Sequence, residues 1–445
     1  MLSTKVEACF FSPVETLAVP RSQQTQAEEA RDRLLDTYPH GELTVIGVRR
    51  LRDVFDHRRL VRRVETGRVR HFARRAWRRK WAVGSGVLML LLVLGLAWTL
   101  YGPLDKNPVA VDFAGTEMKL KNDEGRVVDR ISVGTRVVEQ AQNPDDSYEA
   151  YALQDLTGDG QNEVCWAQRV YENPEASSFV ACRAVGAESP LWRTALEINF
   201  SFSEKPAVQA NAFTPIGLIA GDLDDNGRPE VYLTAKHRPY FPGIVVQYDA
   251  VTGNQTRRYV HAGHLNAQPV ALDLDRNGGI KEILVGGTSN AFGQGVFVVL
   301  DPRTMDGHGP VTAEYRLAEV EPAYVRFPYT PLGRVQQISH PMLRRIGDRA
   351  ASGRIRLEIL DGTYGDGRVM NRPYVLVHLD YDLHPQTVGT SSDYDHLADS
   401  LVADGRLDAV PDGEDFARYR DRIRYWTGAG WTTEPTWNEE WKTIQ

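Results

Sequence analysis

Oxygen-bearing side chains gather at regular spacing in one short stretch of the chain, "GDLDDNGRPEVYL", residues 221–233. Positions one, three, five and nine are held by Asp222, Asp224, Asn226 and Glu230. Carboxylate and amide oxygens at alternate positions around a glycine are the hard ligands that Ca²⁺ prefers. An EF-hand would also need a bidentate glutamate at the twelfth position, which here is Leu233. We therefore expect a calcium loop that joins two strands.

Two further segments repeat this spacing, "LQDLTGDGQNEVCWA" from Leu153 and "ALDLDRNGGIKEILVGG" from Ala271. The first supplies Asp155, Thr157, Asp159 and Glu163. The other supplies Asp273, Asp275 and Asn277, with Glu282 one residue late. That extra residue either moves the last ligand or abolishes the third site. Turns without metal are the alternative, because Asp and Asn bond their own backbone. Three matching copies favour structural Ca²⁺ as the cofactor.

The repeated loops also indicate the architecture that must position them. Their first aspartates are 67 and 51 residues apart, and strand-like segments follow each loop. A unit of about 50 to 65 residues with four short strands matches one blade of a β-propeller. We therefore predict a mainly β chain in which residues 102–445 form a propeller of six or seven four-stranded blades.

Over residues 148–300 the sequence resembles the FG-GAP or VCBS-type repeats, which form calcium-containing propellers such as the head of integrin alpha subunits. The segment "DLDRNGGIKEILVGGT" carries the likeness best, whereas no Phe-Gly pair precedes the loops. The resemblance implies the propeller fold more strongly than an integrin-like activity. It also implies that the calcium sites are mainly structural.

An uncharged run of 20 residues, Ala82 to Tyr101, divides the chain. At about 1.5 Å per residue, such a helix spans a hydrocarbon core of roughly 30 Å. A buried core helix is the alternative. Basic residues crowd into residues 62–81, which places the N-terminus in the cytoplasm. We expect a single-pass protein of the inner membrane, with the lipid bilayer around residues 82–101, residues 102–445 periplasmic or extracellular, and no nucleic-acid partner.

Charge and short patterns describe the cytoplasmic part, residues 1–81. It holds 18 Lys and Arg against 10 Asp and Glu, while the rest of the chain holds 34 against 49. The segments "VETLAVP", "SQQTQAEEARDRLLDTYP" and "GELTVIGV" predict a small β-α-β unit, with a basic helix leading to the membrane. There is no glycine-rich phosphate loop, so this part indicates no activity.

Cysteines Cys165 and Cys182 both fall on the exported side, in a predicted hairpin whose turn lies near Asn173 and Pro174. A cross-strand disulfide and two buried thiols are both compatible with this placement. Cys9 lies on the cytoplasmic side, where a free thiol is expected.

Loops at the end of the propeller opposite the acidic loops are the expected place for partner binding. Aromatic and arginine side chains are enriched at interfaces. The candidates are Arg238, Tyr240, Phe241, Phe292, Tyr324 and Phe327. The alternative is that these rings pack between blades. The segment 321–334 is expected to join these loops, and the acidic segment 391–400 is expected to be a solvated loop.

No catalytic motif was found, so an enzyme is the less favoured interpretation. The sequence predicts a membrane-anchored, calcium-stabilised propeller that binds a protein or glycan, in an adhesion, receptor or scaffold role. The alternatives are an exported polysaccharide lyase or hydrolase, and a sensor propeller coupled to a cytoplasmic effector.

Overall fold

The computed structural model describes residues 15–37, 43–48, 80–101, 105–114, 116–133, 150–168, 177–198, 211–237, 242–276, 278–309, 320–336, 340–349, 353–361 and 373–438. The chain divides into two compact units, Met1–Leu104 and Asp105–Gln445. Each is described by itself.

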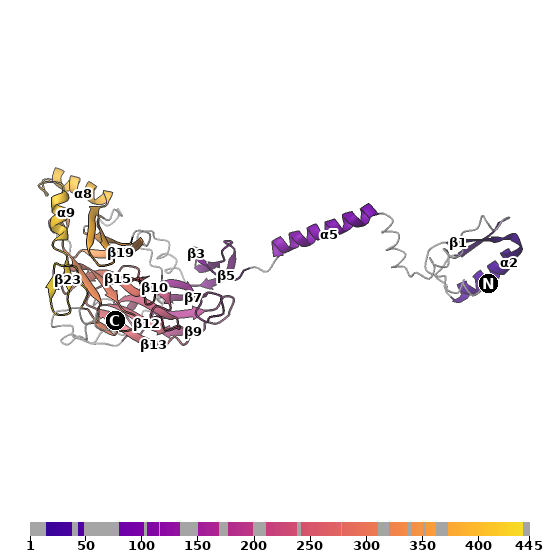
Figure 1. Ribbon diagram of the computed structural model, residues 1–445, viewed down its shortest axis with the longest axis horizontal. Helices are drawn as coiled ribbons and strands as arrows, with labels where there is room; N and C mark the ends of the chain where they lie inside the picture. The colour runs from indigo at the N-terminus through magenta and orange to yellow at the C-terminus, as the bar shows by residue number, and fades with distance from the viewer. Residues whose placement is uncertain are drawn as a thin grey trace. The chain divides into compact units, whose positions relative to one another are not determined.

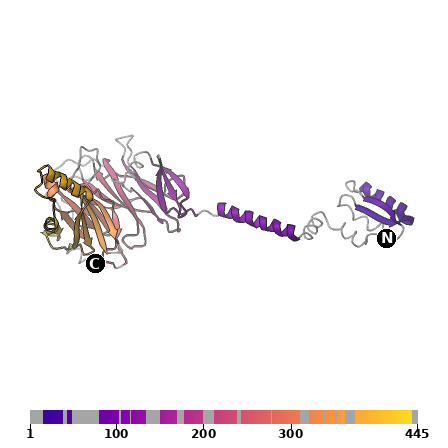
Figure 2. The same cartoon turned by 90° about the horizontal axis from the view of Figure 1, so that it is seen from above.

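In the first unit, strands β1 (Glu15–Pro20) and β2 (Leu43–Val48) pair in parallel. The short 3-10 helix η1 (Arg21–Gln23) and helix α2 (Gln24–Thr37) connect them. Parallel neighbours need such a crossover, because a tight turn can join only antiparallel strands. Figure 2 shows α2 lying along one face of the strand pair. The predicted β-α-β unit is thus present.

The apolar run forms helix α5 (Lys80–Tyr101), which is 22 residues long. Its side chains are described for residues 84–94, and the large apolar ones from Val87 to Leu94 are 53% to 70% exposed. Within the described residues, no helix combines the length and the hydropathy that a membrane crossing requires.

The described residues of the second unit form five sheets, which are antiparallel except for one strand of the third (Figure 1). The first holds β3 (Ala110–Ala114), β4 (Glu117–Lys121) and β5 (Val127–Ser132). The second holds β6 (Tyr151–Gln154), β7 (Glu163–Gln168), β8 (Phe179–Arg183) and β9 (Trp192–Ala195). The third holds β10 (Phe213–Gly221), β11 (Glu230–His237), β12 (Gly243–Asp249), β13 (Gln255–His261) and β17 (Gly307–His308), the last pairing in parallel.

The fourth sheet holds β14 (Val270–Leu272), β15 (Glu282–Ser289), β16 (Gln294–Leu300), β18 (Ala323–Phe327), β23 (Arg424–Trp426) and β24 (Trp431–Thr432). The fifth holds β19 (Met342–Arg349), β20 (Arg354–Leu360), β21 (Tyr374–Asp380) and β22 (Pro385–Thr390). The described part of this unit also contains the helices α7 (Pro331–Val335), α8 (Ser392–Ala403) and α9 (Gly413–Arg420).

Four hydrophobic cores lie between consecutive sheets, from the first and second to the fourth and fifth. Strands β11, β15 and β16 are buried along nearly their whole length, because each has a neighbouring sheet on both faces. Among the described residues, no core joins the first sheet to the fifth. The described part therefore shows a mainly β unit of five sheets, where six or seven blades were predicted, and it does not show a closed ring.

Two segments expected to be loops are regular structure. Residues 321–334 contain β18 and most of α7, so they supply an internal strand of the fourth sheet instead of a surface loop. The acidic segment 391–400 begins α8, with Ser391 as its N-cap. The apolar residues that α8 buries recur every three or four positions: Tyr394, Leu397, Ala398 and Leu401. That spacing forms one helix face, and it packs on the core of the last two sheets.

Candidate metal centre in the acidic loops

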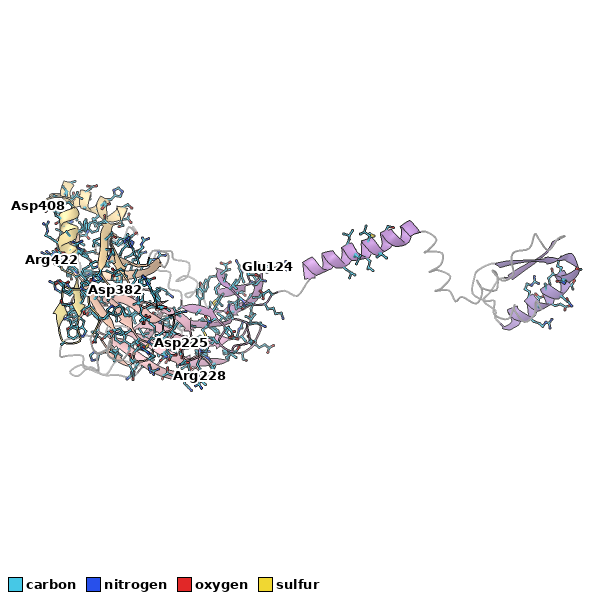
Figure 3. The ribbon with its side chains drawn as sticks, in the orientation of Figure 1. Glu124, Asp225, Arg228, Asp382, Asp408 and Arg422 are labelled. Carbon is cyan, nitrogen blue, oxygen red and sulfur yellow. A yellow bond between two sulfur atoms is a disulfide. The ribbon has the colours of Figure 1, made fainter. Side chains whose placement is uncertain are left out.

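The loop between β10 and β11 brings three carboxylates together. Oxygens of Asp222, Asp224 and Glu230 all lie within 4.8 Å of one another. Figure 3 marks this loop by Asp225 and Arg228. Asp222 and Asp224 are half-buried, and Glu230 is buried at the start of β11. Converging hard oxygens in a loop are a suitable partial shell for Ca²⁺.

Backbone hydrogen bonds fix the first aspartate of this loop. Both Asp222 carboxylate oxygens accept, one from the Asn226 N–H at 3.0 Å and the other from the Gly227 N–H at 2.8 Å. The turn is tight enough to need left-handed backbone at Asp225 (φ 58°) and Gly227 (φ 79°). Leu223, the second residue of the loop, is buried in the core between the third and fourth sheets, so it anchors the loop to that core.

The other two loops repeat this geometry. The N–H of the sixth residue donates to the first aspartate in each, from Gly160 to Asp155 and from Gly278 to Asp273, both at 2.9 Å. Left-handed backbone recurs at the fourth and sixth positions: Gly158, Gly160, Arg276 and Gly278. The second position is again a buried leucine, Leu156 or Leu274. The three segments are therefore copies of one backbone conformation.

The strand register shows that the extra residue of the third loop does not move the last acid. Glu230 pairs with Gly221, the residue before Asp222, and Glu282 likewise pairs with Leu272, the residue before Asp273. The insertion is absorbed within the loop, so the last acid keeps its position at the start of the strand. Asn277 lies outside the described residues.

Burial and neighbouring charge both act on the last acid. Burial, followed by the charges of Asp224 and Asp222, raises the pKa of Glu230 to about 7. Burial is also the main cause that raises the pKa of Glu282 to about 7. Carboxylates held this close disfavour ionisation, and a bound cation would relieve that repulsion.

A second layer of hydrogen bonds holds Glu230. The Tyr232 hydroxyl donates to it at 3.3 Å, and the Gln247 amide donates to that hydroxyl at 3.1 Å. The Asn226 side-chain N–H also donates to Glu230, at 3.2 Å. A rotation of the Asn226 amide group by half a turn would place its oxygen where its N–H group now lies, and the oxygen could then bind a cation. Asp222, Asp224, Asn226 and Glu230 thus fit a Ca²⁺ shell.

The first loop differs in detail. Glu163 is held by the Leu156 N–H at 2.8 Å and the Thr157 hydroxyl at 3.2 Å, while Asp159 accepts from the Gln161 N–H at 2.8 Å. Within the described part of the chain, only the second loop brings three acids within ligand distance of one another. In the third loop, Asp273, Asp275 and Glu282 keep the backbone geometry without that convergence. Ca²⁺ in the first and third loops remains a prediction.

Cys165 and Cys182 form a disulfide. They lie directly opposite each other on β7 and β8, which is where the sequence placed them. Both are buried between the second and third sheets.

The predicted partner-binding residues have mixed placements. Arg238, Tyr240 and Phe241 lie outside the described residues. Phe327 is fully buried, and Tyr324 is 1% exposed, so both pack between sheets instead of lying on the surface. The Tyr324 hydroxyl lies 2.7 Å from Nε2 of His261.

Phe292 is half-buried in the turn between β15 and β16, next to Arg326 and Trp431. Neither Arg326 nor Trp431 was among the residues predicted from the sequence. One sequence pattern could have pointed to Arg326. Side chains alternate between the two faces of a strand, so "AYVRF" places Arg326 on the same face as Tyr324, which was a predicted residue.

Known proteins show only a distant likeness. No family model matches the chain, and no curated protein matches it. Among solved structures, the Dos1 propeller aligns at 9% identity over 61% of this chain and 63% of its own, with a TM-score of 0.32. The exotype rhamnogalacturonan lyase YesX aligns at 13% identity over 64% and 50%, with a TM-score of 0.31. A GH43 β-1,3-galactosidase aligns at 11% identity over 63% and 87%, with a TM-score of 0.31. This chain thus spans between half and two thirds of the length of the Dos1 propeller and of the YesX lyase.

Proposed function

We propose that this chain is a single-pass membrane protein whose sheet unit, residues 105–445, lies outside the cytoplasm, is stabilised by Ca²⁺ and binds a protein or glycan partner. The observation that carries the calcium part is the convergence of Asp222, Asp224 and Glu230 in a loop whose backbone recurs twice. Repetition of the same backbone argues for a shared structural task, since turns built by propensity alone would vary.

The membrane part of the proposal rests on α5. Its described apolar side chains are exposed all around the helix, and lipid is the solvent in which such exposure is favourable. Arg and Lys are concentrated in residues 62–81, before the helix, which favours a cytoplasmic N-terminus. The Cys165–Cys182 disulfide agrees with an oxidising compartment for the sheet unit.

Orientation can be tested with the chain's own thiols. Cys165 and Cys182 are paired, so Cys9 is the remaining cysteine of three. In spheroplasts, a membrane-impermeant maleimide should label Cys9 only after lysis. A matched variant that combines Cys9→Ser with Asp408→Cys places a thiol on an exposed position of the sheet unit, and it should be labelled without lysis. Labelling of Cys9 in intact spheroplasts would contradict the topology.

Partner binding is tested by capture with the full-length tagged chain, extracted in mild detergent, in Ca²⁺ and in chelator. A partner enriched in Ca²⁺ and reduced by chelator or by Asp224→Asn is the expected result. The matched control is Asp225→Asn, which removes an exposed carboxylate from the same loop outside the cluster. The absence of any enriched protein or glycan under both conditions would count against the binding function.

A further inference from the structure

Arg326 lies in a cluster of aromatic rings on the fourth sheet. Its guanidinium carbon is 3.7 Å from the ring centroid of Trp431 and 4.4 Å from that of Phe292. Trp426 packs on Trp431 with centroids 5.1 Å apart. Arg326, Trp431, Phe292 and Trp426 are all half-buried, so the cluster reaches the surface. We call these four residues the arginine-aromatic cluster.

The charge of Arg326 has no acidic partner among the residues that the structure describes. Among the described residues, no carboxylate forms an ion pair with Arg326. Its cross-strand neighbour is a second arginine, Arg424, whose guanidinium donates to the backbone carbonyls of Asp421 and Ile423. Burial, with a smaller effect from Arg424, lowers the pKa of Arg326 to about 10, so it remains a cation at neutral pH. A half-buried cation without a counter-ion is costly.

The cluster contains two buried N–H donors without a partner. Arg326 Nε and Trp426 Nε1 are both buried and have no hydrogen-bond partner within the described part of the chain. The Trp431 and Phe292 rings both lie within 4.4 Å of the guanidinium carbon, and the side chain as a whole is half-buried. A guanidinium matches a carboxylate, which accepts two parallel hydrogen bonds from arginine.

The position of the cluster agrees with the face expected to bind partners. The third acidic loop precedes β15, whereas Phe292 lies in the turn that follows it. Eight residues at about 3.3 Å each separate the two ends by roughly 25 Å. A ligand at the cluster would therefore not compete with a metal in the third loop.

We propose that the arginine-aromatic cluster binds the carboxylate of an acidic saccharide, a uronate, with Arg326 holding the carboxylate and the aromatic rings contacting the apolar face of the sugar. This deepens the proposed binding function and rests on it. A saccharide is favoured over an acidic peptide because the sheet ends here in the two-residue strand β24. That leaves little main-chain edge to which a peptide strand could add. Flat aromatic surfaces and few polar groups are also typical of small-ligand sites.

The test measures binding of the full-length chain in detergent to short uronate trisaccharides of galacturonate, glucuronate and mannuronate. Two control probes each share only part of the chemistry of these uronates. The methyl esters keep the sugar rings without the charge, and triglutamate keeps the charges without the sugar rings. We expect binding of at least one uronate, at least tenfold weaker binding of its ester and of triglutamate, and weakening by salt.

Variants then locate the site. Arg326→Gln should lower uronate affinity at least tenfold, and Arg326→Lys should lower it less, because it keeps the charge but not the paired donors. The control Arg406→Gln removes an exposed arginine after α8 and should change nothing. Thermal unfolding of Arg326→Lys checks that the fold is kept.

Three results would overturn the inference: no binding of any uronate, equal binding of triglutamate, or uronate binding unaffected by Arg326→Gln. None of these results would contradict the proposed binding of a protein or glycan partner. That function fails separately, if capture from cells recovers no partner. A captured partner whose binding is indifferent to Arg326→Gln would keep the function and remove this assignment.

Discussion

Glu282 lies opposite Leu272 across the β14–β15 pair, just as Glu230 lies opposite Gly221 across β10–β11. Counting along the chain gives these two acids different positions in their loops, ninth and tenth. The strand register gives them the same one. Loop identity is therefore set by the pairing of the flanking strands and by the first aspartate, which binds the N–H of the sixth residue in each copy.

The sixth position should be sensitive to any side chain. A Cβ on Gly227 would meet no atom within 4 Å, so the cost of Gly227→Ala lies in its backbone conformation, φ +79°. We expect a loss of about 1 kcal/mol in the free energy of unfolding. Gly389→Ala in β22 is the matched control, because that site is equally open and φ there is not left-handed. Urea unfolding checks both; equal effects at the two sites would contradict the strained-turn explanation.

A buried acid outside the loops should make stability depend on pH. Asp361 is 1% exposed, and burial raises its pKa to about 7 from the ordinary 3.8, although the Thr330 N–H donates to it at 2.6 Å. Between these two values the folded state binds more protons than the unfolded chain, so stability falls as pH rises. The effect of this group is greatest at and above the folded pKa.

Asp361→Asn removes that titration and keeps an acceptor for Thr330. Relative to the native chain, the variant should gain on the order of 2–3 kcal/mol between pH 5 and pH 8. Urea unfolding at both pH values measures this difference. Asp408→Asn, at an exposed position, serves as the control and should gain nothing. A difference between native and Asp361→Asn that is the same at pH 5 and pH 8 would show that Asp361 titrates normally.

The disulfide between Cys165 and Cys182 closes a segment with a sequence separation of 17. Restricting the unfolded chain in this way contributes about 3 kcal/mol. Reduction of the native chain should lower the free energy of unfolding by that amount, and the double variant Cys165→Ala/Cys182→Ala should respond to no reductant. Cys9→Ser is the control for the third thiol. Unchanged stability on reduction would mean that the crosslink has no role in folding stability.

Local features of the fold were predictable because local residues decide them. The β-α-β unit, helix α5 and the hairpin around Cys165 and Cys182 all follow from short patterns of hydrophobicity and turn residues. The acidic loops were visible because each is a single uninterrupted segment. Their oxygen spacing is dictated by the turn itself.

The number of sheets was not predictable in the same way. The fourth sheet is completed by β23 and β24, about a hundred residues beyond β18 along the chain, and no local pattern records that pairing. The surroundings of Arg326 were not predictable for a related reason. Its partners Phe292 and Trp431 come from distant segments and meet only across the folded sheet.

The most direct test of the calcium-stabilised fold is thermal unfolding of the full-length chain in detergent, with added Ca²⁺ and with chelator, for the native chain, Asp224→Asn and Asp225→Asn. Ca²⁺ at a hundred times its Kd should add about 2.7 kcal/mol to the native chain, because it binds only the folded state. We predict the same rise for Asp225→Asn and a much smaller one for Asp224→Asn. A native chain that unfolds at the same temperature in Ca²⁺ and in chelator would contradict the calcium site.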